Sequence, residues 1–307
     1  MKKSNIIFLV AMMVCIVSCR NDELNPTSIF VNPPEKTNRF TDAFDQWLNS
    51  AFVKPYNCEF VYELDDASMD PNYNVVPVGL GKADTMAHIA LYLWYNVYDT
   101  VMSRVGDTAF LYTNGPRKIQ LVGSSMIDAV NGTEKLGYAE GGIQITLLKI
   151  NKMDWYNMEL LNEYIFKTMH HEFSHILHQK KTYPREFETV TPGDYDPIKW
   201  QEMSDEEAWQ RGFVSNYAHC ESHEDFVETI ANYIVKNDDT WAHMLKVAGE
   251  EGTRCINAKL DIARKWLKDQ WNIDIEQMRE EVQARQQHMD YEQIMKCNFD
   301  WKTYPTK

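Results

Sequence analysis

The feature that most constrains this chain is a His-Glu-x-x-His pentapeptide within a long segment of helical periodicity. The segment spans 157–180, and the pentapeptide runs from His171 through Glu172 to His175. Residues i and i+4 lie one above the other on a helix face, so both imidazoles can point at one metal ion. Glu172 lies about 100° round the helix from His171, where its carboxylate can reach a water on that ion.

The residues around the pentapeptide extend the pattern. Thr168, Met169 and Leu177 match the extended signature of the zincin metallopeptidases, which the pentapeptide resembles. The alternative is a chance arrangement of surface or packing histidines. The metzincin subclass is excluded, because its next Gly and His positions hold His178 and Lys181.

A third metal ligand must therefore come from elsewhere. His178 lies about 10 Å along the helix axis from His171, too far for one ion to bind three histidines of a straight helix. We interpret His170 and His178 as flanking or supporting residues. Glu224 and Glu228, four residues apart in a later amphipathic segment, are the better candidates.

Residue types alone leave the roles of these two carboxylates open. Two such residues on one helix face are often only a solvated surface. After a His-Glu-x-x-His helix they also fit a gluzincin site, in which one Glu binds zinc and the other orients a ligand imidazole. The pattern does not decide which of the two would do which.

The rest of the chain combines predicted helices and strands in its first half and is mostly helical in its second half. Helical spacing and β-forming residues predict helices at 39–52, 83–101 and 157–180 and strands at 58–64 and 143–150. Asn114-Gly115 predicts a hairpin over 109–122. Beyond Thr182 a loop leads into helix up to about Met289, with an apolar stripe after Cys255 that we expect to pack on the catalytic region.

This order predicts an α+β fold. A mixed sheet and the motif helix come first, and a mostly helical part follows at about 236–307. We expect residues 39–307 to form one domain. Acidic residues outnumber basic ones, 45 to 31, and the net charge of −14 argues against a nucleic-acid partner.

The first 18 residues are typical of a signal peptide. The apolar run from Ile6 to Val17 has 12 residues, too few for a membrane span. Ser18-Cys19 resembles a lipobox, which implies cleavage before Cys19 and its lipidation; an ordinary secretory signal is the alternative. Residues 19–38 are acidic at first and then rich in proline, and we interpret them as a tether.

Four cysteines remain in the mature chain after Cys19. An oxidising compartment permits disulfides, and the sequence leaves one disulfide and buried free thiols equally open. No CxxC spacing supports a cysteine-based zinc site. The four residues are Cys58, Cys220, Cys255 and Cys297.

The two motifs together resemble the gluzincins related to anthrax toxin lethal factor. In that family a Tyr lies seven residues before the ligand Glu, and a second Glu follows four residues later. Tyr217, Glu224 and Glu228 have this spacing. The resemblance, over about 165–235, implies that Glu224 is the third zinc ligand, that Glu228 supports a ligand imidazole and that Tyr217 donates to the oxyanion.

The size, the signal and the motif placement more closely resemble the substrate import-associated zinc metallohydrolase lipoproteins. That resemblance implies an outer-membrane lipoprotein exposed at the cell surface, which serves a TonB-dependent nutrient transporter. Its expected substrate is a peptide or protein, and its expected cofactor is Zn²⁺.

The expected reaction is hydrolysis of a peptide bond through a zinc-bound water. The resemblance implies that zinc would be held by His171, His175 and Glu224, and we expect Glu172 to be the general base. In zincins an extended substrate docks on an edge strand, for which 143–148 is our candidate. Two other classes stay open: an inactive zinc lipoprotein that binds glycan or peptide, and a metal-free assembly subunit. The intact Glu172 favours the enzyme.

Overall fold

The computed structural model describes residues 43–64, 73–127, 132, 134–135, 137–140 and 143–296. The predicted signal peptide, the tether, the lipidation residue Cys19 and Cys297 lie outside these residues. Within them the architecture is α+β, as predicted, with a small sheet and a larger helical content. None of the described helices is long and apolar enough to cross a membrane.

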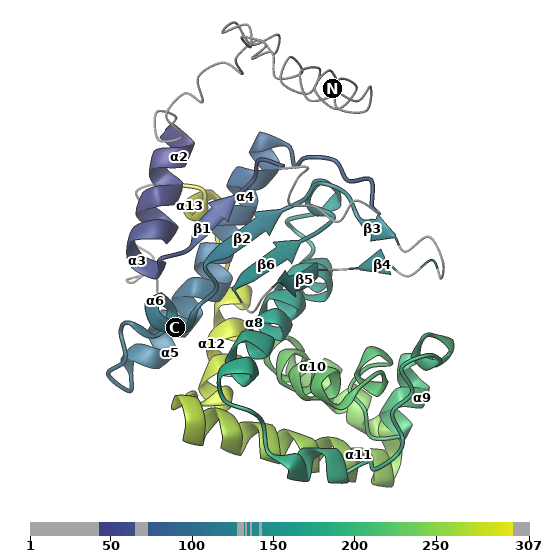
Figure 1. Ribbon diagram of the computed structural model, residues 1–307. Coiled ribbons are helices and arrows are strands. Elements are labelled where there is room, and N and C mark those ends of the chain that lie inside the picture. The colour runs from purple at the N-terminus through teal and green to yellow at the C-terminus, as the bar shows by residue number, and fades with distance from the viewer. Residues whose placement is uncertain are drawn as a thin grey trace, which may run out of the picture. The chain divides into compact units, whose positions relative to one another are not determined.

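A four-stranded sheet has the order β1-β2-β6-β5 (Figure 1). Its strands are β1 (Glu59–Val61), β2 (Lys118–Leu121), β6 (Gln144–Leu147) and β5 (Gly137–Glu140). The first three are parallel, and β5 is antiparallel to β6. A separate antiparallel pair joins β3 (Met126–Ile127) and β4 (Glu134–Lys135).

The strand predicted over 143–150 is confirmed as β6, but its predicted position at the edge is wrong. β6 lies between β2 and β5, with Ile145 opposite Ile119 in β2. Ile145 and Leu147 are fully buried, because parallel strands inside a sheet are covered by helices. The edge strand next to β6 is β5.

The first helices pack over this sheet. The predicted helix over 83–101 is confirmed and begins slightly earlier. It consists of α4 (Leu80–Ala90), η3 (Leu91–Tyr95) and α5 (Asn96–Ser103). Earlier in the chain lie α2 (Ala43–Leu48), η1 (Asn49–Val53) and α3 (Lys54–Tyr56). The π-helical turn η3 carries Trp94 into the core, where its side chain is fully buried.

The hairpin predicted around Asn114-Gly115 is wrong. Phe110–Asn114 forms the short helix α6, and Gly115 ends it by donating its N–H to the Leu111 carbonyl at 2.8 Å. A Cβ at Gly115 would lie 2.5 Å from that oxygen, so glycine is required for this close approach. A two-residue Asn-Gly hairpin turn needs positive φ at both residues, whereas φ of Gly115 is −65°.

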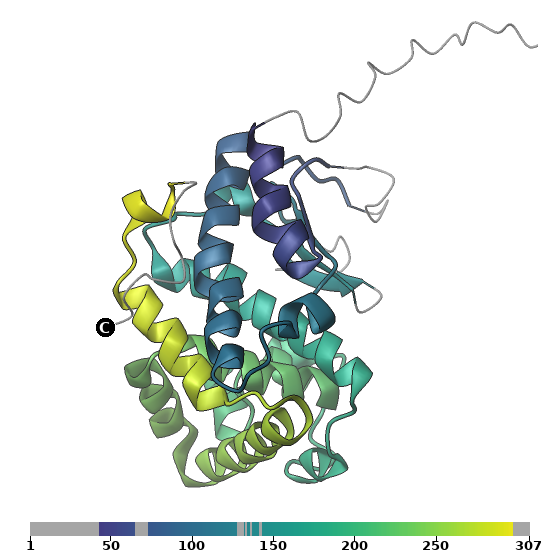
Figure 2. The ribbon, with the colours of Figure 1, turned by 90° about the vertical axis from the view of Figure 1, so that its left-hand side faces the viewer.

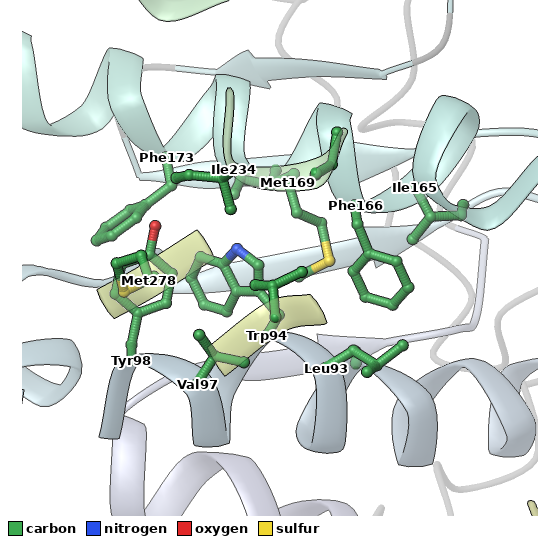
Figure 3. Close-up of a cluster of buried hydrophobic side chains, with 14 of the residues drawn as sticks. Leu93, Trp94, Val97, Tyr98, Ile165, Phe166, Met169, Phe173, Ile234 and Met278 are labelled. Atoms are coloured by element: carbon green, nitrogen blue, oxygen red, sulfur yellow. The ribbon is translucent and has the colours of Figure 1, made fainter. Parts of the chain in front are cut away.

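The motif segment is confirmed as a helix and consists of α7 (Met158–Leu161), η5 (Asn162–Phe166) and α8 (Lys167–Lys180). Asn157 caps its start by accepting the N–H of Leu160. Phe173 packs edge-on against Trp94 and Tyr98, with ring centroids 5.2 and 5.1 Å apart. The cluster in Figure 3 therefore fixes one face of α8 against α5 and η3 and leaves another for the site.

The helical second half is confirmed. Its helices are α9 (Asp205–Gln210), α10 (Ser222–Val235), α11 (Asp238–Trp271), α12 (Ile275–Gln287) and α13 (Tyr291–Ile294). The short 3₁₀ segments are η4 (Ile150–Lys152), η6 (Arg185–Thr189), η7 (Trp200–Glu202) and η8 (Tyr217–His219). α10 packs against α8, α11 and α12, and α12 runs beside α5 and η3 (Figure 2).

The apolar stripe after Cys255 is core, as expected. Leu260, Trp266 and Trp271 are buried, but the helix does not continue to Met289. α11 ends because Asn272 adopts a left-handed conformation with φ of 57°. Of the four cysteines, Cys58, Cys220 and Cys255 are free thiols, so no disulfide joins these three.

Candidate metal centre

The site lies where α8 packs against α10. One face of α8 is held in the core, and this packing directs His171 and His175 toward α10. α10 buries Phe226 and Val227, which places Glu224 and Glu228 on the side facing α8. Helical spacing thus presents two pairs of polar side chains, each four residues apart, to one another.

Three donor atoms from these helices converge. Nε2 of His171 and Nε2 of His175 lie 3.1 Å apart. Oε2 of Glu224 is 3.2 Å from the first nitrogen and 3.3 Å from the second. Donor atoms on a tetrahedral zinc, at about 2.1 Å from the ion, are about 3.4 Å apart. The observed triangle therefore fits one zinc ion.

The electrostatics of the triangle also favour a cation. Burial acts to lower the pKa of His171, but hydrogen bonds to Glu224 and Glu228 raise it to about 10. Burial acts to raise the pKa of Glu224, but hydrogen bonds from His171 and His175 hold it well below its usual value. The carboxylates that stabilise positive charge on an imidazole here would also stabilise a divalent ion.

Glu228 contacts the other side of His171. Its Oε1 is 2.9 Å from Nδ1 of His171, while Oε2 accepts hydrogen bonds from Ser215 at 2.6 Å and from Asn232 at 3.0 Å. Burial would raise the pKa of Glu228, but Lys167 and His171 lower it to about 2. Glu228 is therefore an ionised acceptor that orients the imidazole of His171.

Glu172 lies beside the triangle. Its carboxylate and the imidazoles of His171 and His175 each offer a ligand atom, and these atoms lie within 4.8 Å of one another. Glu172 is buried at 7% exposure. A carboxylate in this position can accept a proton from a group between itself and the donor triangle.

Tyr217 lies on η8, next to the site. Its ring centroid is 5.9 Å from that of His171, and Trp200 packs edge-on against it at 5.0 Å. Burial raises the pKa of Tyr217, and the charges of Glu224 and Glu228 raise it further. Its hydroxyl therefore keeps its proton at neutral pH and can act as a hydrogen-bond donor.

Sequence reasoning missed Ser215 and Asn232, the two donors to Glu228. Neither belongs to a recognisable motif, although Asn232 lies one turn after Glu228. The sequence predicts only a flanking or supporting role for His178, and the structure places its Nε2 2.9 Å from Nδ1 of His175. His223 lies near Glu224, with Nε2 3.4 Å from Oε1.

Fold and site together define an α+β protein with a candidate metal centre of two histidines and one carboxylate. The donor set fits zinc, which is commonly bound by imidazole and carboxylate groups in sites that keep one open position. The chemistry of the site thus points to a zinc-dependent class of protein.

Comparison with protein families finds a match over most of the chain. A family described as "Putative zinc-binding metallo-peptidase" matches residues 37–276, and the chain belongs to this family. The crystal structure of a "putative zinc-binding metallo-peptidase" from Bacteroides caccae is similar, with 31% identity and a TM-score of 0.66. That match covers 81% of this chain and 94% of the other. Comparison with curated proteins finds no match.

Proposed function

We propose that this protein is a gluzincin-type zinc metallopeptidase that hydrolyses peptide bonds. The observation that carries the proposal is the triangle of donor atoms from His171, His175 and Glu224, with sides of 3.1, 3.2 and 3.3 Å. Family membership supports zinc binding and peptidase chemistry. Zinc, when bound, supplies a Lewis acid that polarises a carbonyl and lowers the pKa of water.

The chain's own residues supply the remaining chemistry. Glu172 takes a proton from the attacking water and passes it to the leaving amine. The Tyr217 hydroxyl donates a hydrogen bond to the oxygen that gains negative charge in the transition state. Glu228 holds His171 in the orientation that presents Nε2 to the triangle.

We propose that the substrate docks at the edge of the sheet. An extended peptide can add to a strand edge through main-chain hydrogen bonds. β5 lies at that edge, and α8 packs against β5 and β6. Main-chain pairing with β5 would therefore place a peptide near the motif helix.

The proposed location is the bacterial surface. The signal pattern and Ser18-Cys19 support a lipoprotein anchored through Cys19 to the outer membrane. The proposed partner is a TonB-dependent transporter, which the peptidase would serve during nutrient uptake. Metabolic labelling with a fatty acid tests the anchor, and Cys19→Ala should remove the label.

The decisive experiment is cleavage of a peptide library, followed by mass spectrometry, with and without a chelator. We expect cleavage that the chelator abolishes and added zinc restores. Glu172→Gln should bind zinc as wild type does and lose about 10²–10⁴-fold in rate, because only proton transfer is removed. Equal turnover by this variant would remove Glu172 from the mechanism. Zinc binding without any cleavage would favour a non-catalytic protein that binds glycan or peptide.

A further inference from the structure

In the two histidines of the pentapeptide, the Nδ1 atoms, which are not part of the donor triangle, contact different kinds of side chain. Nδ1 of His171 faces the carboxylate of Glu228 at 2.9 Å. Nδ1 of His175 instead lies 2.9 Å from Nε2 of a third imidazole, that of His178. The proposed function assigns no role to His178.

The proposed function sets the direction of this hydrogen bond, and the inference rests on that function. Nε2 of His175 points at His171 and Glu224, so in a zinc site it carries a lone pair. A neutral imidazole has one proton, which must then lie on Nδ1. The Nδ1–H of His175 therefore donates, and Nε2 of His178 accepts.

His178 is itself held in place by contacts that reach α10. Its ring packs edge-on against Tyr183, with centroids 5.8 Å apart. Tyr183 stacks on Phe226 at 4.6 Å, and its hydroxyl lies 3.0 Å from Oγ of Ser222 and 3.1 Å from Glu188. Phe226 and Ser222 flank Glu224 on α10. These contacts connect the helices that carry the donor triangle.

We propose that His178 is a positioning residue for the metal centre. It fixes the tautomer and ring orientation in which His175 presents its Nε2 lone pair to zinc. A neutral imidazole adds less electron density to its partner than a carboxylate does, so His175 is the weaker of the two histidine ligands.

The test uses three variants at one position and a control on the same helix. His178→Leu removes the acceptor. His178→Gln places an amide oxygen near the position of Nε2, whereas the side chain of His178→Asn is one methylene shorter. Gln179→Leu is the control, because residue 179 is exposed on the same turn. Zinc affinity is measured by competition with a chromophoric chelator, and the ligand field by the visible spectrum of the cobalt-loaded protein.

We expect His178→Leu and His178→Asn to weaken zinc binding about 10–100-fold and to alter the cobalt spectrum. His178→Gln and Gln179→Leu should resemble wild type. Wild-type affinity in a folded His178→Leu protein would overturn the inference and leave the proposed function standing. If the Leu variant does not fold, equal affinities of the Asn and Gln variants overturn it. A wild-type protein that binds no zinc overturns the proposed function and this inference together.

Discussion

At the scale of single residues, Tyr217 offers the most specific test of the reaction. Its proposed hydrogen bond forms only in the transition state, so Tyr217→Phe should lower kcat about 10²–10³-fold with little change in KM or zinc affinity. Steady-state kinetics on a cleaved library peptide measure this. Tyr112→Phe, an exposed tyrosine on α6, is the control. If Tyr217→Phe altered KM alone and left kcat unchanged, the result would contradict the proposed role.

His170 predicts how stability depends on pH. Burial lowers its pKa from 6.5 to about 3 in the folded protein. Between these values the unfolded chain binds a proton that the folded protein does not, so stability falls as pH drops below 6.5. The loss approaches about 1.4 kcal/mol per pH unit, or about 2 kcal/mol by pH 5.

Urea denaturation between pH 7 and pH 5 measures this dependence. His170→Asn removes the titrating ring and keeps a polar atom near the Tyr98 hydroxyl, which lies 3.1 Å from Nδ1. The variant should therefore lose stability less steeply as the pH falls. His243→Asn, on the exposed side of α11, is the control. Equal slopes for wild type and His170→Asn would show that His170 titrates normally.

The proposed ligands were identified from sequence because helix geometry is local. Spacings of four residues put His171 with His175, and Glu224 with Glu228, on common faces before any tertiary contact is known. The donors to Glu228 depend on packing between distant segments. Ser215 precedes α10 and reaches Glu228 only through the loop that follows α9, so no sequence pattern marks it.

At the scale of elements, a buried ion pair joins α10 to α11. Nζ of Lys259 lies 2.6 Å from Asp225, with both side chains at or below 1% exposure. Tyr195 also donates to Asp225 at 2.9 Å. Burial raises the pKa of Asp225 to about 6 and lowers that of Lys259, while their attraction opposes both shifts. The pair therefore holds α10 against α11 at Asp225, the residue that follows Glu224.

Lys259→Met should destabilise the protein by about 3–5 kcal/mol, because it leaves a buried carboxylate without its cation. Adding Asp225→Asn should recover part of this loss. Urea denaturation of both single variants and the double variant forms the required cycle. Additive losses would show that the two side chains do not stabilise each other.

The helices were predicted better than the strands. Periodicity identified the motif helix and the helix around η3, since each has a wide apolar face. The order of strands in the sheet depends on long-range pairing, so the inner position of β6 was not visible in its residues. Asn114-Gly115 favours a hairpin locally, but in the structure Asn114 ends the helix α6 and Gly115 has a φ of −65°, which a two-residue hairpin turn does not allow.

At the scale of the whole molecule, we expect zinc to stabilise a fold that does not depend on it. The cluster in Figure 3 is apolar and includes none of the donor atoms. At zinc concentrations of about 100 times Kd, binding contributes about 2.7 kcal/mol. For a chain of this size that corresponds to a rise in Tm of about 4–5 °C.

Thermal melts with zinc and with a chelator measure the shift, and far-ultraviolet circular dichroism reports the helix content. Glu224→Gln should remove most of the zinc-dependent shift because it weakens the donor triangle. Complete unfolding at 25 °C on chelation would contradict the expectation. An unchanged Tm in the wild type would do so as well.

The donors come from two regular helices, and the chain between them is irregular, with the short segments η6, η7, α9 and η8. Lengthening a flexible surface connection costs little, about 0.6 kcal/mol for each doubling. Insertions can therefore accumulate in the exposed part of this connection, around Ile198, while Tyr183, Ser215 and Tyr217 keep their contacts with the site. Under the proposed function, we expect relatives to differ in the peptides they accept, and we expect that variation to concentrate in this exposed part.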